Sequence, residues 1–353
     1  MKVLAPGRTR STPGESSGPA AAGPKALAAT SPSERAKRWL RDPQVSLLRD
    51  RTEFRARPWR IVLPVVFGIL VLPHAIVSAM DPGSMGWHAT FYTEAAAAWL
   101  QGGDPWVTGP PGIVFAGPPT MLLLFAPWVG LPAEVTRIVW VVGSLLLAID
   151  ILRRLRLPIY FLAFPPLFET IVIGHPEVLV LWLLVSTNAL SGLATVLKPY
   201  TILSLIAERR ALAIAVAALA TLATLAVLPW SRFIADLPMI QHTLAVQANG
   251  DSVFGSTLIV VALGGLVVLG WRRALWLATP LLWPNAQFNY RVASVPQLSP
   301  IIALFWAFPI PGATLMGVLA EALVIALRTR FKLPSWLESG VMPIVVQPIP
   351  ETV

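Results

Sequence analysis

Apolar residues form long runs along this chain, and polar residues are confined to short segments between the runs. The first run spans about 61–80, close to the twenty residues that a helix needs to cross a bilayer. Further apolar runs follow near 118–131, 135–152, 158–173, 177–190, 191–207, 211–229, 256–271, 274–284, 297–309 and 311–327. Several are shorter than a full span. The pattern predicts an all-α integral membrane protein, a multi-spanning bundle of about 10–12 transmembrane helices.

Composition supports the membrane class and predicts interrupted helices. Hydrophobic residues make up 55% of the chain and charged residues only 13%, and the mean hydropathy is +0.67. A soluble domain carries about 25% charged residues. The 34 prolines and 24 glycines fall between apolar runs, as in broken transmembrane helices. We therefore expect short or broken helices at 118–131 and 191–200. Cysteine is absent, which excludes disulfides and thiolate metal sites.

Basic residues are concentrated at the beginning of the chain. Residues 1–60 hold 13 of the 27 Lys and Arg residues but only 5 of the 18 Asp and Glu residues. A basic arm next to a membrane attracts anionic lipid and favours the cytoplasmic side, so we assign membrane lipid rather than nucleic acid as its partner. The predicted domains are a disordered cytoplasmic tail (1–33), an amphipathic basic juxtamembrane segment (34–58), a polytopic membrane domain (59–333) and a C-terminal tail (334–353).

Basic clusters along the rest of the chain predict its orientation as a multi-pass protein of the plasma membrane. They occur at 153–156, 209–210, 272–273 and 328–332, where they should mark cytoplasmic ends. With the N-terminus inside, the polar segment 81–117 emerges on the opposite, extracytoplasmic side. A turn around 174–177 and a polar loop at 230–255 then fall on that same side, and we expect 283–291 to join them.

The segment after the first run carries unusual polar and aromatic residues. Asp81, His88 and Glu94 lie here. A charge at membrane depth costs roughly 2.5 to 3.5 kcal/mol on insertion scales. We therefore expect each of these residues to have a function or a partner. The apolar spacing of 90–100 predicts a short helix that lies on the membrane surface. Its neighbourhood supplies aromatic residues for the headgroup level, namely Trp87, Phe91, Tyr92, Trp99 and Trp106.

A second group of polar residues lies deeper in the apolar sequence. Lys198 is the only lysine between residues 38 and 331, and Pro199 follows it. It could bind an anion or extend to a lipid headgroup. His175 and Glu177 flank Pro176, where they could line an acceptor site or cap a helix. On a helix this spacing would point the two side chains apart, so a metal shared by this pair is not expected. A glycine-rich phosphate-binding loop is missing, which argues against a bound nucleotide.

Five segments, in order, resemble glycosyltransferase family 87, which belongs to the GT-C superfamily of membrane enzymes. They are "FYTEAAAAWLQGGDPW" with "FAGPPTMLLLFAPWVGLP", "GHPEVLVLWLLV", "LATVLKPYTILSLIAERR", "NGDSVFG" and "LLWPNAQFNYRVASVPQL". The resemblance covers about residues 60–330. In the family an acid stands a few residues before the Tyr of the first segment. His88 is four residues before Tyr92 here, and Asp81 is eleven before it. Either residue could fill that position. We favour Asp81, because an imidazole is a different kind of base.

The resemblance implies an inverting hexosyl- or pentosyltransferase with its site on the extracytoplasmic face. Its partners would be a polyprenyl-phosphate sugar as the donor, mannose being the family's best-known sugar, and an envelope glycolipid or polysaccharide as the acceptor. A base must take the acceptor's proton, and a positive group must stabilise the departing phosphate. The implied catalytic residue is Asp81, with His88 and Glu94 as alternatives. The implied donor-phosphate residues are Lys198, Tyr290 and Arg291, and the implied acceptor or sugar residues are Tyr92, His175, Glu177, Asn249 and Asn289. No metal ligands and no certain cofactor are assigned, and help from a divalent cation stays open.

Two other functions remain open on sequence alone. A transporter or lipid flippase for envelope glycan precursors would use similar broken helices and sparse intramembrane charges. An internal repeat would favour this alternative, and we see no convincing similarity between the two halves. A non-catalytic membrane scaffold is the third alternative, and it would be favoured if Asp81 proved dispensable.

Overall fold

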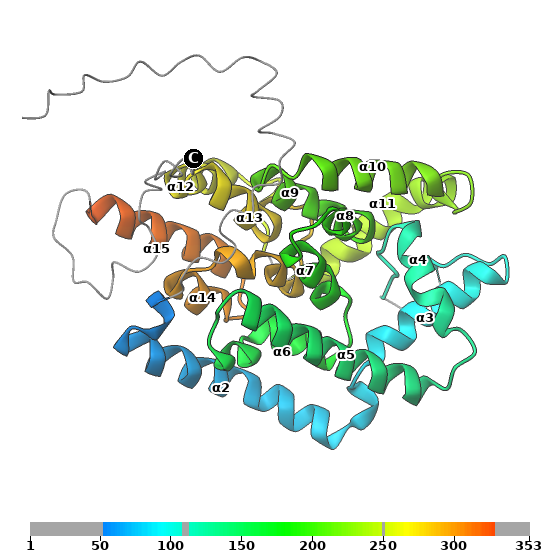
Figure 1. Cartoon of the computed structure of the whole chain (residues 1–353), viewed down its shortest axis with the longest axis horizontal. Coiled ribbons are helices and arrows are strands. Elements are labelled where there is room, and N and C mark those ends of the chain that lie inside the picture. The colour runs from blue at the N-terminus through cyan, green and yellow to red at the C-terminus, as the bar shows by residue number, and fades with distance from the viewer. Residues whose placement is uncertain (1–51, 108–112, 249–250, 329–353) are drawn as a thin grey trace, which may run out of the picture. The chain divides into compact units, whose positions relative to one another are not determined.

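Helices make up every regular element in the part of the chain that the structure describes. The computed structural model describes residues 52–107, 113–248 and 251–328, all within the unit Trp39–Val353. The α-helices are α2 (Arg57–Met80), α3 (Trp87–Leu100), α4 (Pro119–Phe125), α5 (Ala133–Arg154), α6 (Pro165–Val172), α7 (Glu177–Val185), α8 (Gly192–Leu197), α9 (Ile202–Ala207), α10 (Ala211–Thr224), α11 (Trp230–Gln247), α12 (Ile259–Leu269), α13 (Trp271–Leu282), α14 (Pro300–Trp306) and α15 (Ala313–Arg328) (Figure 1). Short 3₁₀ helices are η1 (Thr52–Arg55), η2 (Pro82–Ser84), η3 (Ala126–Trp128), η4 (Ile159–Ala163), η5 (Ala189–Ser191), η6 (Pro199–Thr201) and η7 (Phe288–Gln297).

The predicted all-α class is confirmed for these residues, and so are two of the predicted helix breaks. Residues 118–131 form α4 followed by η3, and residues 191–200 form α8 followed by η6. The predicted tails 1–33 and 334–353, and most of the predicted basic segment 34–58, lie outside the described residues.

Among the described residues, two helices are long and apolar enough to cross a membrane, α2 with 24 residues and α5 with 22. They run in opposite directions. A Cβ on Gly86, just after α2, would lie 2.8 Å from the Cα of Arg137 near the beginning of α5. After α5 the chain returns to the segment before α2, where Tyr160 Oη donates to the carbonyl oxygen of Phe54 at 3.1 Å. The apolar runs near 61–80 and 135–152 therefore predicted these two helices correctly.

A third span exists by length and composition if α6 and α7 are taken together. These two helices are bent by 119° at the four residues between them, as in a broken span or a re-entrant loop. Shorter apolar helices include α10 and α12, which have 14 and 11 residues. Prolines end or interrupt several of the predicted runs, because proline lacks the N–H that an uninterrupted helix needs. The predicted total of ten to twelve spans is therefore not confirmed.

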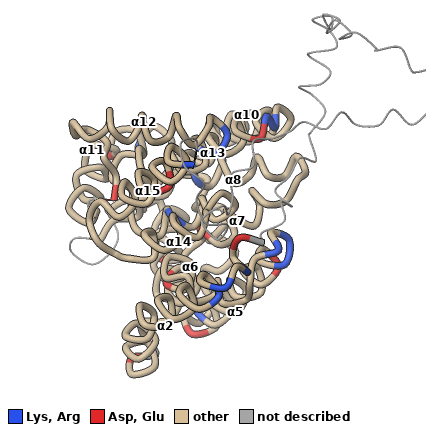
Figure 2. The backbone as a smooth tube through the Cα atoms, turned by 90° about the vertical axis from the view of Figure 1, so that its left-hand side faces the viewer, with Lys and Arg blue, Asp and Glu red and all other residues tan. Residues whose placement is uncertain are grey.

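Arginines gather at the end of α5 and the beginning of α2. The Trp182 indole donates to Asp150 at 2.8 Å, which joins the end of α7 to the end of α5. Arg210 donates to the carbonyl oxygen of Ser186 at 3.0 Å, which brings the beginning of α10 to the same place. Figure 2 looks onto this end, with basic segments in blue beside α10 and α13. Its arginines are Arg57, Arg60, Arg153, Arg154, Arg156, Arg209 and Arg210.

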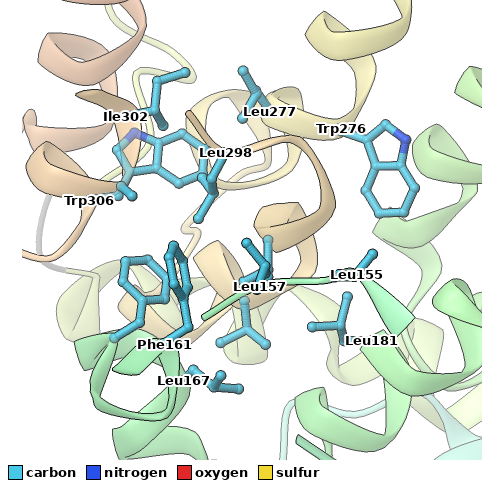
Figure 3. Packing of buried hydrophobic residues seen from close by; sticks show 14 of the residues in the cluster. Leu155, Leu157, Phe161, Leu167, Leu181, Trp276, Leu277, Leu298, Ile302 and Trp306 are labelled. Atoms are coloured by element: carbon cyan, nitrogen blue, oxygen red, sulfur yellow. The ribbon is translucent and has the colours of Figure 1, made fainter. Parts of the chain in front are cut away.

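The largest apolar core lies between the central helices and is built from branched and aromatic side chains. Figure 3 shows Phe161, Leu167 and Leu181 facing Leu298 and Trp306 across this core. Burying each such side chain contributes about 1.5 to 3 kcal/mol. The indole N–H of Trp306 donates to the carbonyl oxygen of Thr314 at 3.1 Å, so its burial leaves no donor unpaired.

The helix predicted at 90–100 exists as α3, but three of the five aromatic side chains predicted for the headgroup level are buried. Phe91, Tyr92 and Trp106 are 5%, 6% and 1% exposed. They pack in a second apolar cluster together with Phe115 and Phe125. The prediction of a surface-lying helix is wrong for these side chains because α4 and the segment before it cover them.

The predicted polar loop at 230–255 is also wrong for most of its length, since residues 230–247 form α11. Phe233, Ile240 and Leu244 recur at helical spacing and pack into the second cluster. Arg232, on the exposed side, pairs with Asp104 at 2.7 Å and ties α11 to the segment after α3.

Candidate functional site

Eight polar side chains meet where four separate parts of the fold come together, and we call them the polar cluster. Seven of them are buried, and His88 is half-buried. They come from α3, from the turn between α6 and α7, from the break between α8 and α9, and from η7. The members are His88, Tyr92, His175, Glu177, Lys198, Tyr200, Asn289 and Tyr290.

Glu177 lies at the centre of the polar cluster and is 1% exposed. It is the first residue of α7, where the helix dipole favours a carboxylate. One oxygen, Oε1, lies 2.9 Å from Lys198 Nζ and accepts a hydrogen bond from Tyr200 Oη at 3.1 Å. The other oxygen, Oε2, contacts His175 Nδ1. Pro176 precedes α7 and His175 precedes Pro176, so the two side chains do not share a helix, and the expectation that they point apart is wrong.

Lys198 reaches this buried position because the chain is interrupted at Pro199. A residue before proline avoids the helical conformation, and Lys198 has φ −139° and ψ 98° between α8 and η6. Its ammonium group lies 5.7 Å from the ring centre of Tyr290. Glu177 takes one of the three donors of the ammonium group. Lys198 thus keeps a positive charge away from bulk water, next to one carboxylate.

Two glycines allow α3 to contact the turn between α6 and α7. Gly86 and Gly174 have φ +68° and +72°, and a Cβ on Gly174 would lie 3.0 Å from Gly86 Cα. The contact is fixed by backbone hydrogen bonds from Gly86 N to the Val172 oxygen at 2.8 Å and from His88 N to the Ile173 oxygen at 3.0 Å. The imidazole rings of His88 and His175 consequently lie 4.8 Å apart.

Replacing Gly174 with alanine should therefore destabilise the protein. The left-handed backbone alone costs a non-glycine residue about 1 to 2 kcal/mol, and the added methyl group would also press on Gly86. Gly102→Ala is a matched control, because Gly102 has φ +78° with open space around its Cβ position. We expect the free energy of unfolding, measured in detergent, to fall further for Gly174→Ala. Equal losses in the two variants would show that the contact with Gly86 contributes nothing.

His88 should make stability depend on pH. Burial first, and then the charge of Lys198, lower the pKa of His88 from 6.5 to about 3. Between those two values the unfolded chain binds a proton that the folded protein does not, so stability rises with pH across this window. Acidification from pH 7 to about 4.5 should lower the Tm. His88→Gln should reduce that fall, whereas His242→Gln should not, because His242 is exposed. Identical pH dependence in all three proteins would contradict the prediction.

The structure brings seven of the eleven residues assigned from sequence into the polar cluster. Tyr200 completes the cluster and was missed, although its position two residues after Lys198 was a usable signal. The seven residues are His88, Tyr92, His175, Glu177, Lys198, Asn289 and Tyr290.

Three of the other four assigned residues, Asp81, Glu94 and Arg291, are not in the polar cluster. Asp81 follows the last residue of α2, is exposed, and accepts a hydrogen bond from Gly83 N at 3.0 Å in a local turn. Glu94 is exposed on α3. Asn249 lies outside the described residues. Asp81 remains a catalytic candidate by resemblance only, since no contact joins it to the cluster in the described part of the chain.

Arg291 is fully buried and already paired. Its Nε donates to Asp251 Oδ2 at 3.0 Å, and its Nη2 contacts Asp251 Oδ1. Nη1 donates to the carbonyl oxygens of Trp306 and Phe308, both at 2.7 Å. This arginine therefore fixes η7, which carries Asn289 and Tyr290, against the end of α14. Its donors are not directed at the polar cluster.

Within 52–107, 113–248 and 251–328, no group of three or more His, Asp or Glu side chains could hold a metal ion. Comparison with protein-family models, with curated proteins and with solved structures gives no match. The function is therefore argued from the residues of the polar cluster.

Proposed function

We propose that this chain is a membrane glycosyltransferase that moves a sugar from a polyprenyl-phosphate donor to an envelope glycolipid or polysaccharide. The sugar would be mannose or a pentose, transferred with inversion. The proposal is supported by the apolar helices α2 and α5, by the polar cluster, and by the resemblance of five sequence segments to glycosyltransferase family 87.

The observation that carries the proposal is the position of Lys198. A buried ammonium group is costly unless it serves an anion, and Glu177 takes only one of its donors. The leaving group of the proposed reaction is a phosphate on a lipid, which must be stabilised as its charge develops. Tyr200 and Tyr290 lie beside Lys198, with ring centres 4.7 Å apart, and supply hydroxyl groups and an aromatic surface.

The surroundings of the polar cluster suit a lipid-linked donor. Leu179 and Leu197 are partly buried and pack against both apolar cores on either side of the cluster. An anion there would be in a medium of low dielectric constant, where a fixed positive charge acts more strongly than in water. The same medium excludes water, which would otherwise hydrolyse an activated sugar.

The place of the polar cluster relative to the arginines supports an extracytoplasmic reaction. The turn between α6 and α7 is bonded to Gly86, after the end of α2, whereas Arg57 and Arg60 lie at the beginning of α2. Under the positive-inside rule the arginine-rich end faces the cytoplasm. The cluster then lies toward the opposite face, where polyprenyl-phosphate sugars would meet envelope acceptors.

A transporter or lipid flippase is the second candidate function. The bent pair α6–α7 carries buried charges at its break, and transporters bind substrates and ions at such interrupted helices. In that case Lys198 would hold the phosphate of a glycan precursor during transport without any bond being broken.

The test is a transfer assay with the purified full chain in lipid nanodiscs. Wild-type protein receives a radiolabelled polyprenyl-phosphate sugar, first mannose and then a pentose, together with an envelope glycolipid acceptor. We expect labelled product from wild type and from Asp81→Asn, because Asp81 is exposed and lies outside the polar cluster. We expect a lower rate from Glu177→Gln, which removes the negative charge beside Lys198.

The other outcomes decide between the functions. Loss of transfer in Asp81→Asn alone would return the catalytic role to Asp81. Failure of wild type with every donor, together with movement of a fluorescent polyprenyl phosphate across reconstituted liposomes, would favour the flippase. Neither transfer nor movement would favour a scaffold.

A further inference from the structure

His175 meets different kinds of partner at its two ring nitrogens. Nδ1 contacts Glu177 Oε2, and an ionised carboxylate can only accept, so Nδ1 carries the proton. Nε2 lies 2.7 Å from Tyr92 Oη, and Asn289 Nδ2 lies 3.1 Å from Nε2 and 3.3 Å from Nδ1. We therefore assign the proton of a neutral imidazole to Nδ1, beside the carboxylate, and the lone pair to Nε2, beside the Tyr92 hydroxyl.

Glu177 is arranged to orient this imidazole. Its Oε1 is held by Lys198 and Tyr200, so the carboxylate cannot turn without breaking both contacts. Its Oε2 is thereby fixed toward His175. A general base is commonly a histidine that a carboxylate orients through one ring nitrogen while the other nitrogen faces a hydroxyl group.

We propose that His175 takes the proton from the acceptor in the transfer reaction, an inference that rests on the glycosyltransferase function proposed above. The acceptor group is an alcohol of a sugar, and its attacking hydroxyl replaces the Tyr92 hydroxyl at Nε2. Glu177 is a positioning residue that acts through His175. This assignment differs from the carboxylate at Asp81 that the family resemblance implies.

The cluster already holds a hydroxyl group at the required place. Burial raises the pKa of Tyr92 to about 12, so Tyr92 stays protonated and donates to Nε2. A sugar hydroxyl is the same kind of donor. Two further polar atoms of the cluster, His88 Nδ1 and Asn289 Oδ1, are buried and have no hydrogen-bond partner among the described residues. They are suited to the neighbouring hydroxyl groups of a sugar ring.

The step balances with groups that the proposal names. The acceptor oxygen forms a bond to the anomeric carbon of the donor sugar as its proton passes to His175 Nε2. The bond between that carbon and the phosphate oxygen breaks, and its electron pair leaves with the polyprenyl phosphate. Lys198 stabilises the new phosphate charge. The imidazolium then returns its proton to the released phosphate or to water.

The rate of this step should follow the protonation state of His175. Transfer should rise with pH as the imidazole loses a proton, and then level off. Several titratable or charged groups lie around His175 and contribute to the position of that rise: His88 and Tyr92 from α3, Glu177 from α7 and Lys198 from the break after α8. Behind them, Tyr200 is bonded to Glu177, and the ring of Tyr290 from η7 lies beside that of Tyr200.

The experiment measures kcat/KM for transfer against pH in nanodiscs, with the same labelled donor and glycolipid acceptor. His175→Asn keeps a donor for Glu177 but has no base in place of Nε2. We expect kcat/KM to fall about 100- to 10,000-fold and the rise with pH to disappear. His175→Ala should recover part of the activity when imidazole is added. Glu177→Gln should lower kcat/KM and shift the pH at which kcat/KM rises. His242→Gln is the control and should match wild type.

Two failures can be told apart. If wild type transfers sugar and His175→Asn keeps both the rate and the rise with pH, His175 is not the base, although the glycosyltransferase function stands. Absence of rescue by imidazole in a folded His175→Ala protein would also overturn the inference. If wild type itself transfers nothing from any donor, the proposed function fails.

Discussion

Replacing Arg291 with methionine is expected to lower the free energy of unfolding by about 3 to 5 kcal/mol, because Asp251 would be left buried without its cation. Arg291 is 0% exposed and Asp251 is 1% exposed. The substitution also removes the donors to the carbonyl oxygens of Trp306 and Phe308. Denaturant unfolding in detergent, followed by tryptophan fluorescence, would measure the loss.

Two further variants make this prediction specific. Arg232→Met removes an ion pair of similar length with Asp104, but Arg232 is half-exposed, so the loss should stay below about 1 kcal/mol. The double variant Arg291→Met with Asp251→Asn removes the lone charge and should recover part of the stability. If Arg291→Met and Arg232→Met lowered the free energy of unfolding by the same amount, the buried ion pair would contribute no more to stability than the exposed one.

Replacing Lys198 with methionine should reduce sugar transfer about 100- to 1000-fold, the usual loss when one stabilising donor is removed from a developing negative charge. Methionine keeps a long apolar side chain at the break after α8. Lys198→Arg should not restore full transfer, because a planar guanidinium presents its donors differently from an ammonium. Initial rates in the nanodisc assay measure both effects.

A structural loss must be separated from a chemical one. Lys198→Met leaves the Glu177 carboxylate without its cation, so we also combine it with Glu177→Gln, which removes the uncompensated charge. The double variant should unfold closer to wild type than Lys198→Met does, and it should transfer sugar more slowly than Glu177→Gln alone. Arg209→Met is the control, since Arg209 is an exposed cation outside the polar cluster, over the ring of Trp271. Wild-type rates in Lys198→Met would refute a role in binding the phosphate.

Sequence reasoning found most of the polar cluster because polar residues are rare in this chain. His175, Glu177 and Lys198 stand alone in apolar surroundings, so each is conspicuous. It also placed α2 and α5 to within a few residues, since their apolar runs are long. Pro64 and Pro73 lie inside α2 without ending it.

The same reasoning could not decide which charges are neutralised by distant partners. Arg291 and Asp251 are 40 residues apart in sequence, and only the fold shows that they satisfy each other. The contact between His175 and Glu177 was missed for a local reason. The prediction assumed that both residues lie on one helix. In the structure α7 begins at Glu177, and His175 lies in the turn before it.

The helix count failed for a physical reason as well. Proline and glycine divide the apolar runs into pieces, and the lengths of the pieces depend on packing that periodicity does not reveal. The aromatic residues after α2 are buried because α4 packs on them. The spacing of apolar residues within α3 could not predict this contact, because α4 is a separate segment later in the chain.

The contact between Gly86 and Gly174 has a mechanical consequence. Because backbone hydrogen bonds join the two segments directly, α3 and the turn that carries His175 should move as one rigid body. Any displacement of α3 by an arriving acceptor would be transmitted to His175 through the main chain, without a relay of side chains. Recognition at α3 and the alignment of the imidazole would then be a single motion.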